Sequence, residues 1–88
     1  MTDKPLRTRF KLFYFVPMGA EYENSYGEPK WNCCRVHDDR ILGIVYWRES
    51  MRQHVFNGSD TLLLSRKGLR NIAKFIKQLK PPKGQKDQ

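Results

Sequence analysis

The chain has 88 residues, and 17 lysines and arginines against nine aspartates and glutamates give it a net charge of +8 at pH 7. This length fits one small domain, and a hydrophobic content of 39% is enough for a core, which argues against a fully disordered chain. The longest apolar stretches, residues 12–18 and 41–47, are too short to cross a bilayer and no signal peptide is visible, so we expect a cytoplasmic protein without membrane contact.

The first predicted strand covers residues 8–16, where aromatic and β-branched side chains are frequent, and Pro17 ends it. Alternation divides its side chains between two faces. One face holds Phe10, Leu12, Tyr14 and Val16, and the other holds Arg9, Lys11, Phe13 and Phe15. The second face is polar at its start and apolar at its end, so we expect the strand to enter the core partway along.

Residues 18–30 are predicted to form a loop, because glycine, asparagine, serine and proline are frequent there. Between residues 17 and 29 the chain carries three glutamates and no base, so this segment is acidic. Its two tyrosines, Tyr22 and Tyr26, either serve as contact residues for a partner or pack the loop onto the sheet.

The second predicted strand, residues 31–36, contains the two adjacent cysteines Cys33 and Cys34. Neighbours on a strand point to opposite faces, so the two thiols cannot easily pair with each other. A four-ligand zinc set with His37 and His54 fits no usual finger spacing. We therefore expect no disulfide, no bound metal and no cofactor.

Three turns and three further strands are predicted before the helix. His37 is followed by an aspartate pair that favours a tight turn into a strand over residues 41–47. A second turn at residues 48–50 leads to a strand over 51–56, and the Asn57-Gly58 pair is typical of a two-residue hairpin turn. Residues 60–64 are a candidate for a last short strand.

The helix is the clearest predicted element, with Ser65 as its N-cap and the Pro81-Pro82 pair beyond its end. Apolar residues recur at helical spacing, with Phe75 at the margin of the apolar face. That face holds Leu69, Ile72, Ala73, Ile76 and Leu79. We expect it to be buried against the sheet.

Positive charge is concentrated on the opposite side of this helix and behind it. Residues 66–88 carry +7 of the net charge, whereas residues 1–65 carry only +1. The candidate binding residues are Arg66, Lys67, Arg70, Lys74, Lys77 and Lys80. Most of them fall within a sector of about 100° around the helix axis. Such a stripe of positive charge either binds an anionic partner or is exposed to solvent without a binding role.

These elements predict an α+β fold: an antiparallel sheet of three to five strands, with one C-terminal amphipathic helix packed on one face. Residues 1–80 would form the single domain, and residues 81–88 a disordered basic tail. The other sheet face would be open to solvent or to a partner. Candidate residues for that second surface are Arg9, Lys11, Asn32, Cys34 and His54.

Residues 42–47, 51–56, 60–61 and 69–79 together carry a family resemblance. The chain resembles a family of short uncharacterised phage, prophage and bacterial proteins with a Leu-Gly hairpin strand ending in Trp, an Arg-Gln-x-x-Phe strand and a C-terminal amphipathic helix. It departs at Met51 and His54, where the family often has Trp and Tyr. The shared pattern implies a packed role for Trp47 and implies no activity.

Function stays open between several classes. No nucleophile, phosphate loop, metal motif or carboxylate pair suggests an enzyme. The first hypothesis is a non-catalytic protein-interaction or regulatory module that engages a host or phage protein, as a monomer or homodimer. The alternative is binding of DNA or RNA without sequence specificity through the basic side of the helix. A stable domain with a merely solvated basic helix is the third.

Overall fold

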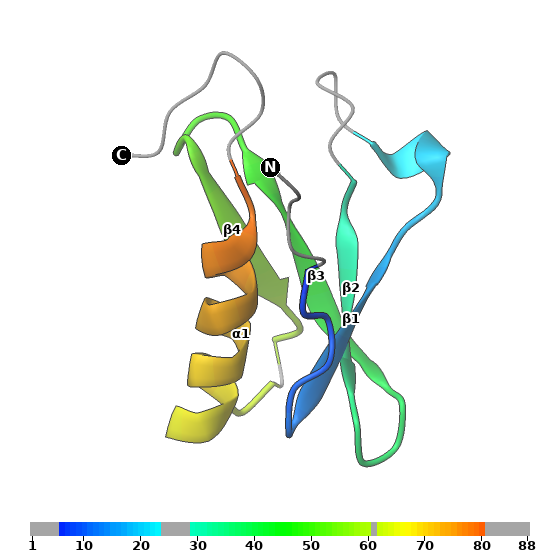
Figure 1. The fold of residues 1–88 in the computed structure, drawn as a ribbon, viewed down its shortest axis with the longest axis vertical. Helices are drawn as coiled ribbons and strands as arrows, with labels where there is room; N and C mark the ends of the chain where they lie inside the picture. The colour runs from blue at the N-terminus through cyan, green and yellow to red at the C-terminus, as the bar shows by residue number, and fades with distance from the viewer. Residues whose placement is uncertain (1–5, 24–28, 61, 81–88) are drawn as a thin grey trace, which may run out of the picture.

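The protein is a four-stranded antiparallel sheet with one C-terminal helix, and the computed structural model describes residues 6–23, 29–60 and 62–80 (Figure 1). The strands lie side by side in chain order and are β1 (Phe13–Pro17), β2 (Trp31–Arg35), β3 (Ile41–Arg48) and β4 (Gln53–Gly58). A short 3₁₀ helix, η1 (Ala20–Tyr22), follows β1, and the helix α1 spans Arg66–Gln78. The predicted α+β class is therefore confirmed. The predicted tail and part of the acidic loop lie outside the described residues.

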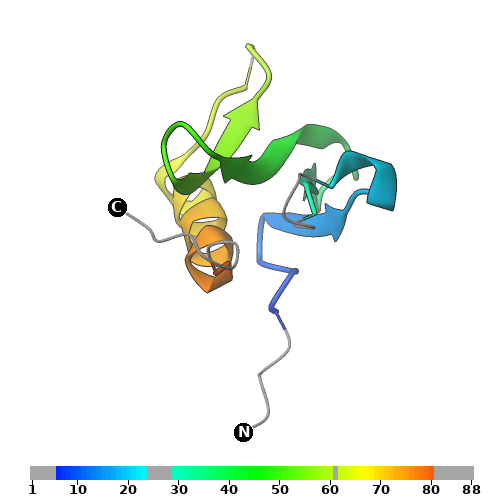
Figure 2. The same ribbon diagram turned by 90° about the horizontal axis from the view of Figure 1, so that it is seen from above.

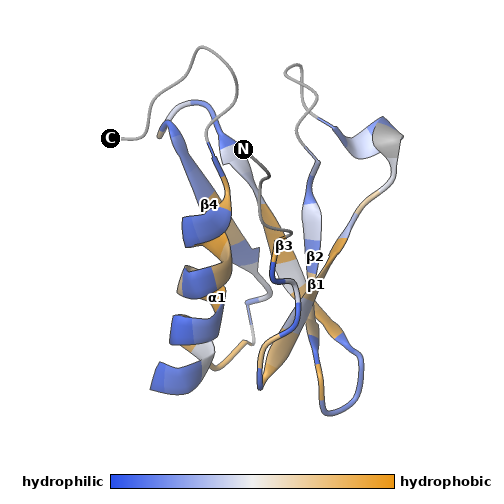
Figure 3. Ribbon diagram, in the orientation of Figure 1, coloured by the Kyte–Doolittle hydropathy of each residue, from blue (hydrophilic) through white to orange (hydrophobic). Residues whose placement is uncertain are grey.

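The helix lies on one side of the twisted sheet (Figure 2). It contacts β1 and β4, which are the two edge strands, so it closes one face of the sheet across its full width. Figure 3 shows the resulting division of the helix surface, with hydrophilic residues outward and hydrophobic residues toward the strands.

Aromatic side chains dominate the core between sheet and helix. Phe75 of α1 is fully buried, stacks on Phe15 at 4.0 Å between ring centroids, and meets Trp31 edge to face at 5.1 Å. Cys33 and Val45, also fully buried, complete the layer beneath these rings. Burying a side chain of this size contributes about 1.5–3 kcal/mol, so Phe75 is a major source of stability.

The helix presents a different face to the sheet from the one that the apolar periodicity predicts. Its buried residues are Gly68, Ile72 and Phe75, while Leu69 is 55% exposed and Ala73 is exposed as well. The expectation that Phe75 lies at the margin was wrong. Gly68 contributes to this orientation, because an added Cβ would lie 3.0 Å from the Phe13 ring and the ring would have to move by a few tenths of an ångström.

The first strand is shorter than predicted because the chain folds back on itself before Phe13. The Phe15 amide donates to the Thr8 carbonyl at 2.8 Å, and Arg9 forms an isolated antiparallel bridge with Tyr14. Residues 8–12 are thus a separate segment beside β1. The fold-back turns Phe10 into the core, where its ring meets Phe15 edge to face.

The end of the sheet also differs from the sequence prediction. Asn57 and Gly58 are the last residues of β4, with Gly58 opposite Gly43, so the predicted hairpin turn was wrong. A Cβ on Gly43 would lie 2.5 Å from the Asn57 carbonyl oxygen, which shows that β4 approaches β3 too closely here for any other residue. The described residues between 60 and 64 belong to no strand, contrary to the prediction.

Candidate functional site

The basic side of α1 is held in place by defined helix ends. Ser65 has extended backbone angles, and its hydroxyl accepts the Gly68 amide at 3.1 Å, as expected for an N-cap. At the other end the Leu79 amide donates to the Ile76 carbonyl at 2.9 Å. The predicted start of the helix after Ser65 is confirmed, whereas its end at Gln78 comes before Leu79, which was expected on the apolar face, and the Pro81-Pro82 pair lies outside the described residues.

All six predicted binding residues are exposed on this helix and just after it. We call them the basic face, and they are Arg66, Lys67, Arg70, Lys74, Lys77 and Lys80. They lie opposite the buried residues of α1, which is why its outer surface is hydrophilic in Figure 3. The structure thus brings all of the predicted helical site residues onto one surface.

The basic face has no counter-charge within α1, whose sequence contains no acidic residue. Several of its members are four residues apart, such as Arg66 and Arg70 or Arg70 and Lys74, and such like-charge pairs each cost about 0.2–0.5 kcal/mol. Arg66 and Lys67 also occupy the first turn, where the helix dipole disfavours positive charge. Within the described parts of the chain, no basic-face residue takes part in an ion pair. This charge pattern disfavours the isolated helix and suits an external anion.

Two polar side chains of α1 fix the helix against the N-terminal segment. The Leu12 amide donates to Asn71 Oδ1 at 3.0 Å. Gln78 accepts the Arg7 amide at 2.8 Å and returns a bond from Nε2 to the Arg7 carbonyl at 2.9 Å. The sequence analysis missed these contacts. The sequence signal that could have indicated these contacts is the spacing of Asn71 and Gln78, which are seven residues apart and border the apolar face.

The acidic turn between β2 and β3 has a structural role. Asp39 has a positive φ of 60°, and its amide donates to the Arg35 carbonyl at 2.7 Å. Asp38 forms an ion pair with Arg35, whose hydrogen bonds lower the pKa of that carboxyl to about 2. The interpretation of this segment as turn chemistry is supported by these partners.

A second polar cluster lies on the sheet face away from the helix. The Tyr14 hydroxyl donates to Asp39 Oδ1 at 2.8 Å, and this bond raises the pKa of Tyr14 to about 12. Burial raises the pKa of the neighbouring Cys34 thiol, and that of Cys33 in the core to about 12. Both cysteines are free thiols. Burial therefore disfavours the thiolate form of both cysteines.

The second predicted surface, on the open sheet face, is not assembled as expected. Cys34 is only 6% exposed. His54 pairs with Trp47 and its ring lies 5.1 Å from the indole, so it belongs to the strand face that carries Val45. Cys34 therefore lies on the open face but is buried, and His54 lies on the other face of the sheet. Trp47 is buried and donates its indole N–H to Glu49 at 2.9 Å, which confirms its predicted packed role.

Searches of the described residues and of known proteins add three findings. No group of three or more His, Cys, Asp or Glu side chains in residues 6–23, 29–60 and 62–80 is arranged to hold a metal ion. No helix in the same residues has the length and apolarity needed to span a membrane. Comparison with family models, curated proteins and solved structures found no match to this chain, so the family resemblance stays a prediction.

Proposed function

We propose that this protein is a non-catalytic binding module whose basic face contacts the phosphates of DNA or RNA. The observation that carries the proposal is a helix with five exposed cations and no acidic residue, followed by exposed Lys80, and docked so that Gly68, Ile72 and Phe75 are buried. A rigid helix of 13 residues is about 20 Å long and displays these charges in a fixed arrangement. Neutralising phosphates with such cations releases counterions and favours binding.

The proposed binding is independent of base sequence. Lysine and arginine side chains on phosphates position a protein without reading base edges. Asparagine and glutamine side chains typically recognise adenine through paired hydrogen bonds. The two such residues of α1, Asn71 and Gln78, already form hydrogen bonds with the N-terminal segment. The helix therefore offers charge rather than a base-specific pattern.

A charge-reversal experiment tests this proposal. Lys74→Glu combined with Lys77→Glu should reduce the affinity for duplex DNA and for RNA strongly and to a similar degree for unrelated sequences. Arg9→Glu combined with Lys11→Glu is the matched control, because it changes the net charge equally and both residues are exposed in the segment before β1. Equal weakening by both changes would point to diffuse attraction by the whole molecule, and no weakening by the double reversal would exclude the basic face.

A protein-interaction module that engages a host or phage protein is the second candidate. Leu69 is 55% exposed and Ala73 is exposed, and both border the basic face. An apolar strip beside cations suits an acidic amphipathic protein segment better than it suits phosphates alone. A pull-down with and without nuclease distinguishes the two: partners retained after nuclease treatment support this candidate, and partners lost support nucleic acid.

A further inference from the structure

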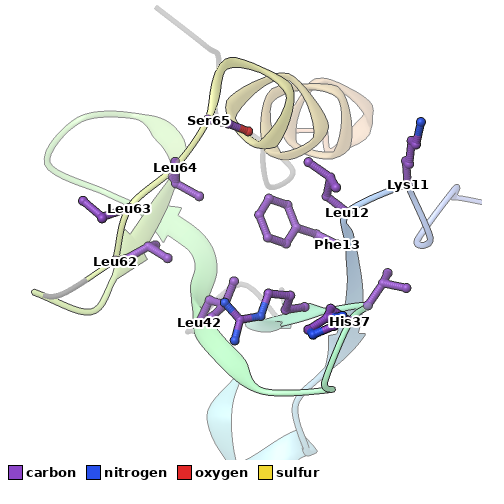
Figure 4. A pocket seen from close by; sticks show the side chains of 11 residues that line it. Lys11, Leu12, Phe13, His37, Leu42, Leu62, Leu63, Leu64 and Ser65 are labelled. Carbon is purple, nitrogen blue, oxygen red and sulfur yellow. The ribbon is translucent and has the colours of Figure 1, made fainter.

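A half-open pocket lies at the end of the molecule where α1 begins, separate from the basic face (Figure 4). Its volume is about 360 Å³. Three parts of the chain meet there: the segment that leads into β1, the turn between β2 and β3, and the segment that leads into α1. The apolar walls are formed by Leu12, Phe13, Leu42, Leu62, Leu63 and Leu64. Figure 4 shows the Phe13 ring directed into the space between Leu64 and Leu42.

The exposure of these leucines indicates that the pocket is not closed by the chain itself. Leu63 is 93% exposed, although it lines the pocket, and Leu12, Leu42, Leu62 and Leu64 are only partly buried. A ligand seated there would remove this apolar surface from water. At the ~30 Å³ that a water molecule occupies in the liquid, the pocket has room for about a dozen non-hydrogen atoms.

The charged residues of the lining are Lys11 and Arg35, and its other polar residues are His37 and Ser65. The pocket is lined by no aspartate or glutamate. The charge of Arg35 is offset by its ion pair with Asp38, which leaves Lys11 as the main source of positive potential. Lys11 lies at the edge of the pocket beside Leu12, and its side chain is directed away from the leucines in Figure 4. Rotation of this flexible side chain would bring its ammonium group to the head group of a bound ligand.

We propose that this pocket binds a small amphipathic carboxylate, with its hydrocarbon part between the leucines and its anionic end at Lys11. Apolar walls with a few polar groups at one side are the usual composition of a small-ligand site. This site is independent of the proposed nucleic-acid contact, because it shares no residue with the basic face.

A chain-length series of hexanoate, octanoate and decanoate tests the apolar part of the site by titration calorimetry. Each buried methylene contributes about a fourfold gain in affinity, so two methylenes should tighten binding about 15-fold. The gain should level off at about ten carbons, when the pocket is filled. Affinity that does not depend on chain length, or absence of binding at millimolar decanoate, would overturn the proposal.

Two exposed positions test the site without endangering the fold. Leu63→Asp should weaken decanoate binding at least tenfold at unchanged thermal stability, because its side chain is almost fully solvated in the free protein. Lys11→Ala should weaken octanoate but leave the neutral ligand 1-octanol unaffected. Lys30→Ala is the matched control, because Lys30 lies at the opposite end of β2, over the Tyr46 ring. Equal effects of Lys11→Ala and Lys30→Ala, or none from Leu63→Asp, would contradict the assignment.

Discussion

At the scale of single residues, Phe75 is the side chain on which the core depends most. It is fully buried and contacts aromatic rings on both β1 and β2. The helical periodicity identified the apolar side of α1 but not its centre. The centre depends on Gly68, which lets the Phe13 ring approach the helix axis, and a glycine carries no hydropathy signal of its own.

Truncating this ring should therefore be costly. Phe75→Ala is expected to lower the free energy of unfolding by about 3–5 kcal/mol, because it removes the transfer energy of the ring and leaves a cavity. Leu69→Ala is the control, since Leu69 is more than half exposed, and it should cost less than about 1 kcal/mol. Chemical denaturation measures both values. A larger loss for Leu69→Ala would restore the helix orientation that the periodicity alone predicts.

A second prediction at this scale concerns acid stability. The Arg35 hydrogen bonds lower the pKa of Asp38 in the folded protein to about 2, below its value in an unfolded chain. The contribution of this carboxylate is therefore complete above about pH 4 and is lost as the pH falls toward 2.

Asp38→Asn should accordingly make the stability less dependent on pH between about pH 4 and 2, while the wild type loses stability over that range. The measurement is the denaturation midpoint of both proteins across the range. Parallel curves for the two proteins would show that this ion pair adds nothing to the acid response.

At the scale of elements, local sequence signals predicted the start of the helix correctly. They failed where contacts between distant segments determine the conformation of the chain. Ser65 predicted the start of the helix correctly, and the helix ends at Gln78, before the proline pair. Apolar and polar residues continue to alternate through residues 8–12, so no local sequence signal indicates that this segment turns back toward β1. Asn57-Gly58 has the composition of a turn, but pairing with β3 keeps it in a strand.

The candidate site shows the same division. The five cations within α1 were predicted because a helical repeat places them on one side whatever the helix contacts. The hydrogen bonds of Asn71 and Gln78 to the N-terminal segment could not be predicted, since that segment lies 59–71 residues away in sequence.

The close contact of β3 and β4 gives a prediction for this hairpin. Gly43→Ala should destabilise the protein by about 1–3 kcal/mol, because the new methyl group would meet backbone atoms that cannot move aside. Gly19→Ala is the control, as its Cβ would meet only the flexible end of Glu21. Thermal unfolding compares them. Equal stability of the two variants would show that β4 can shift away from β3.

At the scale of the whole molecule, charge is distributed unevenly: seven of the eight net positive charges lie in residues 66–88. In the sheet and its turns, Arg35 forms an ion pair with Asp38, and the carboxylates of Asp39 and Glu49 accept side-chain hydrogen bonds. The basic face does not, within the described residues. This difference between a nearly neutral body and a cationic helix is the basis of the proposed nucleic-acid binding.

The salt dependence of binding to a short DNA duplex tests this central claim most directly. If four to six phosphates are neutralised together, the logarithm of the affinity should fall with the logarithm of the salt concentration with a slope of about −4 to −5. Lys74→Glu with Lys77→Glu should make that slope shallower by about 2. Absence of any complex with duplex, single strand or structured RNA at micromolar protein and about 50 mM salt, where such binding is strongest, would contradict the account.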